Sequence, residues 1–237
     1  MNTWKTIALL VAALLVLTAA GCGAGGQTTT ASVSTTGATQ TTTAPATAPA
    51  TSDDGLAEEY AVYGALIQSM FIDAPRSSPM TQGMFTDAGR PPALIVIEDT
   101  TPQPDSGFSP PDAVRFMRNY HPELADEIWS DFQTKNEKPS LLERRFTLSV
   151  EYVFVSRQEL ESVFSKNASG WEDFYAKYPR SQGILTLSRV GFNEARDTAV
   201  LYAGNQWHAA AGEGNMVLMK KTAGGWTVQD RAVMWTS

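Results

Sequence analysis

Cysteine and histidine are scarce in this chain. Its 237 residues include one Cys, Cys22, and two His, His121 and His208. A single Cys excludes a disulfide within the chain, and two distant His without further Cys argue against a zinc or haem centre. We therefore expect no metal and no cofactor.

The common catalytic motifs are also missing. The sequence has no Gly-x-Ser-x-Gly elbow, P-loop, dinucleotide fingerprint or His-Glu-x-x-His pair. These absences lower the expectation of an enzyme but do not exclude one whose residues converge only in the folded chain.

Positive charge is in the minority. Lys5 is the only charged residue before Asp53, which leaves 17 Lys and Arg against 25 Asp and Glu in the remainder, a net charge of −8. Such an acidic surface repels phosphate backbones, so nucleic acid is excluded as an expected partner.

A long apolar run occurs only at the N-terminus. Lys5 precedes Ile7–Ala20, which is shorter than the roughly 20 residues that span a bilayer. The small residues Ala20 and Gly21 then stand directly before Cys22, a pattern that resembles the lipobox of a bacterial lipoprotein signal. The resemblance implies removal of residues 1–21 and attachment of acyl chains such as palmitate to Cys22. It also implies export and anchoring to the cell membrane or outer membrane. The alternative is an ordinary secretory signal with an incidental Cys.

Residues 22–52 change in composition. Gln27–Ser52 is rich in Thr, Ala and Pro, carries no charge, and has Val33 as its only bulky apolar residue. Such a segment buries too little surface to offset the entropy of ordering, so we expect a disordered tether. One globular domain is then expected over residues 53–237.

The pattern within 53–237 predicts an α+β fold. Strand-like runs separated by turn residues indicate an antiparallel β-meander, with a further strand expected from strict alternation. The four meander runs are Ile184–Phe192, Thr198–Gly204, Met216–Lys221 and Trp226–Trp235, and the further strand is Arg145–Val155. Helical spacing is expected over Leu56–Phe71, in a pair of helices between Val114 and Phe132, and in a second pair within Arg157–Tyr178. Helices covering one face of an antiparallel sheet would be similar to the cystatin or NTF2-like folds, an analogy that carries no function.

Several stretches of the domain are similar to a known group of proteins. The stretches GWEDFYAKYPRSQGILTLSRVGFN, AVLYAGNQ and GGWTVQDRAVMW, together with EEYAVYGALIQSMF near its start, resemble a group of bacterial exported proteins. The resemblance implies export and implies no activity.

The most site-like stretch is the expected loop Gly204–Gly214. It places Asn205, Gln206, Trp207, His208 and Glu213 in a connection between two strands, where binding groups often lie. His208 could act as a general base oriented by Glu213. The plainer interpretation is a wide hairpin with Trp207 packed on the core.

Aromatic residues also recur within the last expected helix. Trp171, Phe174, Tyr175 and Tyr178 follow at helical spacing, which is more typical of a core face than of a sugar-stacking platform.

Three functions remain open from the sequence. The favoured hypothesis is a lipid-anchored envelope protein that binds an envelope ligand or partner protein and catalyses no reaction. The alternatives are an envelope hydrolase that uses His208 with a carboxylate, and a structural or assembly lipoprotein.

Overall fold

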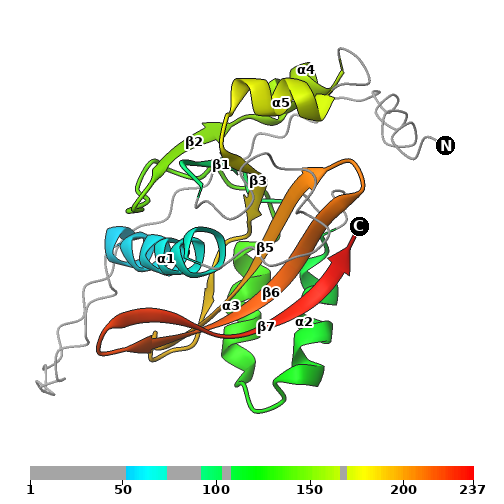
Figure 1. Ribbon diagram of the computed structural model, residues 1–237. Coiled ribbons are helices and arrows are strands. Elements are labelled where there is room, and N and C mark those ends of the chain that lie inside the picture. Colours follow the sequence, from blue (N-terminus) through cyan, green and yellow to red (C-terminus); the bar gives the residue numbers. More distant parts are fainter. Residues whose placement is uncertain (1–51, 74–91, 103–107, 166–169) are drawn as a thin grey trace, which may run out of the picture. The chain divides into compact units, whose positions relative to one another are not determined.

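A computed structural model describes residues 52–73, 92–102, 108–165 and 170–237 (Figure 1). The chain divides into two units, Met1–Thr47 and Ala48–Ser237, and every described residue belongs to the second. The predicted signal, Cys22 and most of the predicted tether lie outside the described residues.

The second unit has an α+β fold, as the sequence predicts. Its helices are α1 (Ser52–Ile67), a π-helical turn η2 (Gln68–Ile72), α2 (Pro110–Tyr120), α3 (Asp126–Lys135), α4 (Arg157–Phe164) and α5 (Gly170–Lys177). Its strands are β1 (Leu94–Glu98), β2 (Glu151–Val155), β3 (Ser181–Leu187), β4 (Gly191–Phe192), β5 (Thr198–His208), β6 (Ala211–Thr222) and β7 (Gly225–Thr236).

The strands form one mixed sheet in the order β2-β1-β3-β5-β6-β7, with β4 paired to β5. The meander is confirmed, because β3, β4 and β6 pair antiparallel with β5, and β7 pairs antiparallel with β6. The expectation of an antiparallel sheet throughout was wrong. β1 pairs in parallel with both β2 and β3, because long connections that contain helices separate these strands in the sequence.

Helices cover both faces of the sheet, not one face as the sequence suggested (Figure 1). α1 packs on one face, where Leu66 and Ile67 meet Leu201 and Val217 in the main core. The opposite face carries two helix pairs: α2 and α3 pack on β5–β7, and α4 and α5 pack on β1–β3. None of the helices in these described ranges is long and apolar enough to cross a membrane.

The predicted strand Arg145–Val155 is shorter than its alternation indicated. Only Glu151–Val155 forms β2, and the preceding residues run irregularly. Phe146 is buried against the rings of Tyr60 and Tyr63 of α1, at centroid distances of 5.0 and 5.6 Å. The alternation therefore reflects burial against a helix as well as pairing in a sheet.

The predicted strand Ile184–Phe192 is interrupted. β3 ends at Leu187 and β4 begins at Gly191, so Ser188, Arg189 and Val190 leave the ladder. Ser188 still bonds to Tyr202 of β5, whereas Arg189 and Val190 find hydrogen-bond partners in α1 and at the end of α3.

The prediction of a loop over Gly204–Gly214 was also wrong. β5 continues to His208 and β6 starts at Ala211, with Asn205 opposite Glu213. Only Ala209 and Ala210 turn, so the two strands form a long tight hairpin in which glycine pairs with glycine.

Ser156 caps the start of α4 and forms one half of a capping box. Glu159 donates its backbone N–H to the Ser156 hydroxyl, 3.1 Å away, as a capping box requires. The Glu159 carboxylate does not return to Ser156 but accepts from Lys177 and Tyr178 at 2.5 Å each. The aromatic stripe is core: Phe174 and Tyr178 are buried, and Trp171 and Tyr175 pack against them half-buried.

Candidate functional site

The predicted site residues lie at the distal half of the β5–β6 hairpin. Asn205 is buried, whereas Gln206, Trp207, His208 and Glu213 are half-buried. Trp207 is fixed through its backbone, whose carbonyl accepts from the Tyr175 hydroxyl at 2.9 Å. The structure therefore places these residues on one hairpin, where their backbones pair as β-strands and do not form a loop.

The proposed acid–base pair does not form. The Glu213 carboxylate lies 3.9 Å from Arg231, and among the interactions of the described residues none joins Glu213 to His208. His208 Nδ1 accepts instead from the backbone N–H of Ala210 at 3.4 Å. Among the described residues, no carboxylate is therefore recorded in position to orient His208 as a base.

Asn205 lines a small cavity beside the end of α1. Phe71, Gln182 and Gly183 share its wall, and the Asn205 side-chain oxygen has no hydrogen-bond partner. Gln182 Nε2 donates to the Phe71 carbonyl. With a volume of about 10 Å³ the cavity has room for one water and for no larger ligand.

His121 has a structural role between α2 and β7. It caps α2 by donating its backbone N–H to Met117, and its ring is flanked by Glu123 at 3.0 Å and Asp230 at 3.1 Å. The hydrogen bond with His121 helps to lower the pKa of Glu123, after a larger effect from that residue's own backbone. The two carboxylates contact opposite ring nitrogens, so one metal ion cannot bind all three groups.

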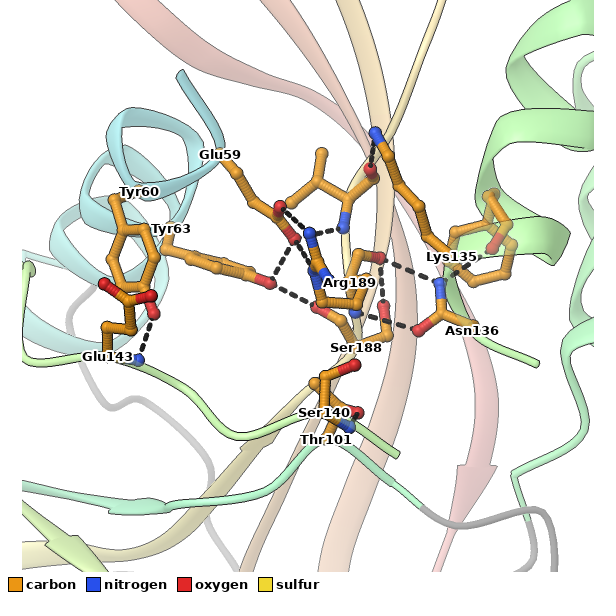
Figure 2. Close-up of polar contacts among 12 residues, drawn as sticks. Glu59, Tyr60, Tyr63, Thr101, Lys135, Asn136, Ser140, Glu143, Ser188 and Arg189 are labelled. Carbon is orange, nitrogen blue, oxygen red and sulfur yellow. Dashed lines mark hydrogen bonds and ion pairs between the residues drawn. The ribbon is translucent and has the colours of Figure 1, made fainter. Parts of the chain in front are cut away.

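A buried polar cluster centres on Glu59 of α1 (Figure 2). Its side chain is 2% exposed and accepts two hydrogen bonds from Arg189, at 2.7 and 2.8 Å. It also accepts from the Val190 backbone and from the Tyr63 hydroxyl, at 2.9 and 2.8 Å. The hydrogen bond to Glu59 raises the pKa of Arg189, and burial first, then Glu59, raise that of Tyr63.

The same cluster reaches α3 through the break between β3 and β4 (Figure 2). Asn136 accepts from the Arg189 backbone N–H at 2.8 Å and donates to the Phe132 and Arg189 carbonyls. Lys135 donates to the Val190 carbonyl at 3.1 Å. Because these groups satisfy one another, we interpret the cluster as a joint that ties α1 and α3 to the sheet, not as a ligand site.

A different set of residues forms a row across the second face of the sheet. Ile97 pairs with Leu185, which places Glu98 beside Thr186, and Thr186 pairs with Gly204. Gly204 pairs with Gly214, which pairs with Trp235. Directly paired residues share a face of the sheet. We call Glu98, Thr186, Gly204, Gly214 and Trp235 the transverse row.

At one end of the transverse row Glu98 is largely buried, with a side chain 17% exposed. One carboxylate oxygen accepts from the Thr186 hydroxyl at 3.1 Å, and the other lies 4.0 Å from Nε of Arg157. Burial raises the pKa of Glu98, although Thr186 and Arg157 oppose the shift. The second oxygen thus has only a distant ionic partner.

At the other end Trp235 lies over glycines. A Cβ at Gly214 would fall 2.0 Å from the indole nitrogen, and one at Gly212 would fall 3.1 Å from the ring. Glycine at these positions therefore allows the indole to lie against the hairpin. Its N–H donates to the Tyr202 hydroxyl at 3.0 Å, and 36% of Trp235 stays exposed.

Tyr202 connects the two ends. A Cβ at Gly204 would lie 2.7 Å from its hydroxyl, so that hydroxyl occupies the middle of the row. Burial raises the pKa of Tyr202, and the charge of Glu98 adds to the effect. The row thus brings together a carboxylate, hydroxyls and an indole on one face, where Trp235 is the most exposed of them and Tyr202 is buried.

The sequence reasoning missed this row. Glu98 closes a buried apolar strand, and the spacing of Gly204, Gly212 and Gly214 suggested a loop. A signal was present: glycines in alternate positions of a strand often accommodate an aromatic ring from a neighbouring strand.

In the part of the chain that the structure describes, no group of three or more His, Cys, Asp or Glu side chains is arranged to hold a metal ion. Comparisons of the chain with protein-family models, curated proteins and solved structures find no match.

Proposed function

We propose that this chain is an exported protein, anchored to the bacterial envelope by lipid on Cys22, whose folded domain binds an envelope ligand without transforming it. The anchor is supported by the apolar run Ile7–Ala20 ending in small residues before the only Cys. The long uncharged segment after Cys22 is a suitable tether, since it would give the domain reach from a membrane surface. Two or more acyl chains would hold it there stably.

The binding role is supported by the transverse row. Glu98, Thr186 and Trp235 present an acceptor, a hydroxyl and an aromatic ring along one face, and the glycines between them let the rings of Tyr202 and Trp235 lie against the strands. A few convergent polar groups beside an aromatic surface are typical of ligand sites. The separation of His208 from Glu213 favours binding over hydrolysis by that pair.

The anchor is tested by mass spectrometry of the full-length gene product from a bacterial host. The mature protein should begin at Cys22, carry diacylglycerol on its sulfur and partition into the membrane fraction. Cys22→Ser should abolish the lipid and the partitioning, whereas Ser34→Ala, in the same tether, should change neither. A soluble mature protein whose N-terminus lies elsewhere would contradict the anchor.

A further inference from the structure

We propose, building on the binding function above, that the transverse row recognises an uncharged saccharide. The argument rests on the local charge, on the free surface of Trp235 and on the spacing along the row.

The charges at the Glu98 end offset one another. Its carboxylate lies within 4.0 Å of the Arg157 guanidinium, so the pair offers acceptors and donors with little net charge. Sugar hydroxyls both donate and accept, and they match such a mixed set. A free anion would meet the Glu98 carboxylate in a domain of net charge −8, and a free cation would compete with Arg157.

The free surface of Trp235 is its ring. Because the indole N–H already donates to Tyr202 at 3.0 Å, a ligand meets mainly the π face. That face is electron-rich and attracts the slightly positive C–H groups on one side of a sugar ring. The glycines beneath hold the ring in one orientation, which reduces the entropy lost on binding.

The spacing fits one or two sugar rings. Thr186 and Gly214 are two strand positions apart, which corresponds to roughly 10 Å. Glu98 lies beyond Thr186, and the indole reaches back over Gly214 from β7. A ring stacked on Trp235 would thus have its neighbour within reach of Thr186 and Glu98.

The test uses the full-length lipidated protein in detergent and a panel of soluble, uncharged oligosaccharides built from hexoses or N-acetylhexosamines. Binding is measured by calorimetry and by tryptophan fluorescence. We expect at least one oligosaccharide to bind, and we expect Trp235→Leu to weaken it about tenfold or more. Trp235→Phe, which keeps a ring without the N–H, should retain most of the affinity, and Glu98→Gln should weaken it several-fold.

The matched controls are Trp226→Phe, a Trp in the main core on the other face of the sheet, and Glu161→Gln, an exposed carboxylate on α4. Both should bind as the parent does, and circular dichroism establishes that each variant is folded. Saccharide binding that survives Trp235→Leu and Glu98→Gln would overturn the assignment to the row. If charged ligands or peptides bind and no saccharide does, the saccharide proposal fails while the binding function stands. If no class of ligand binds, both fail.

Discussion

Arg189 makes two hydrogen bonds, 2.7 and 2.8 Å long, to the carboxylate of Glu59, an α1 residue that is almost completely buried. The pair joins residues 130 positions apart and holds the backbone in place where the chain leaves the sheet between β3 and β4. Burying a carboxylate is costly unless it is fully paired, so this contact makes the placement of α1 depend on one side chain.

Glu59→Ala should therefore destabilise the domain by about 3–5 kcal/mol, since it leaves the Arg189 guanidinium and the Val190 backbone N–H without their acceptor. Urea denaturation measures the change. Glu161→Ala, on the exposed side of α4, should stay within about 0.5 kcal/mol of the parent. Equal effects from the two substitutions would show that the cluster contributes nothing special.

Glu98 should make the domain less stable as the pH rises. Its pKa is raised in the folded state, chiefly by burial, so folding favours the protonated acid. The folded state loses stability as the pH rises from the ordinary carboxyl pKa, 4.5, through the raised value. Glu98→Gln should remove this loss and be more stable than the parent at pH 7, with little difference near pH 3. A lower stability of Glu98→Gln at pH 7 would contradict a raised pKa.

Gly214→Ala should displace the Trp235 indole, because the new methyl group would lie 2.0 Å from its nitrogen. We expect a loss of about 1–3 kcal/mol, the usual cost of overpacking, together with a change in tryptophan fluorescence. Gly224→Ala is the matched control, since its nearest neighbour would be 3.8 Å away. Unchanged fluorescence in Gly214→Ala would mean that the indole does not rest on the hairpin.

Ser156→Ala should cost about 1 kcal/mol by removing the N-cap of α4. Thermal unfolding should show the loss, and Ser156→Asp, which can also cap, should restore most of it. Ser165→Ala, at the other end of α4, has no capping side chain to lose and should be near neutral.

The sequence predicts the meander well because its signals are local. Turn residues such as Gly224 and Gly225 separate the strands, and alternating residues sort between two covered faces. The parallel pairing of β1 was out of reach, since Ile95–Ile97 is an apolar run that names no partner.

Glu59 and Glu98 show why the polar centres were harder to predict. The sequence places Glu59 in the first turn of the first helix, where a carboxylate is ordinarily exposed, but α1 begins earlier, at Ser52, and the residue is buried. Its partner Arg189 is distant in the chain, and so is Thr186, the hydrogen-bond partner of Glu98. Such contacts depend on the tertiary fold rather than on local spacing.

The binding function is tested most directly by thermal unfolding of the full-length protein with envelope glycans, peptides and lipids, beside Trp235→Leu. We predict that one class raises the melting temperature, by an amount equivalent to about 2.7 kcal/mol at 100 times the dissociation constant, and that Trp235→Leu abolishes the shift. No shift with any class, in a protein that is folded and lipidated, would contradict a binding role and favour an assembly protein.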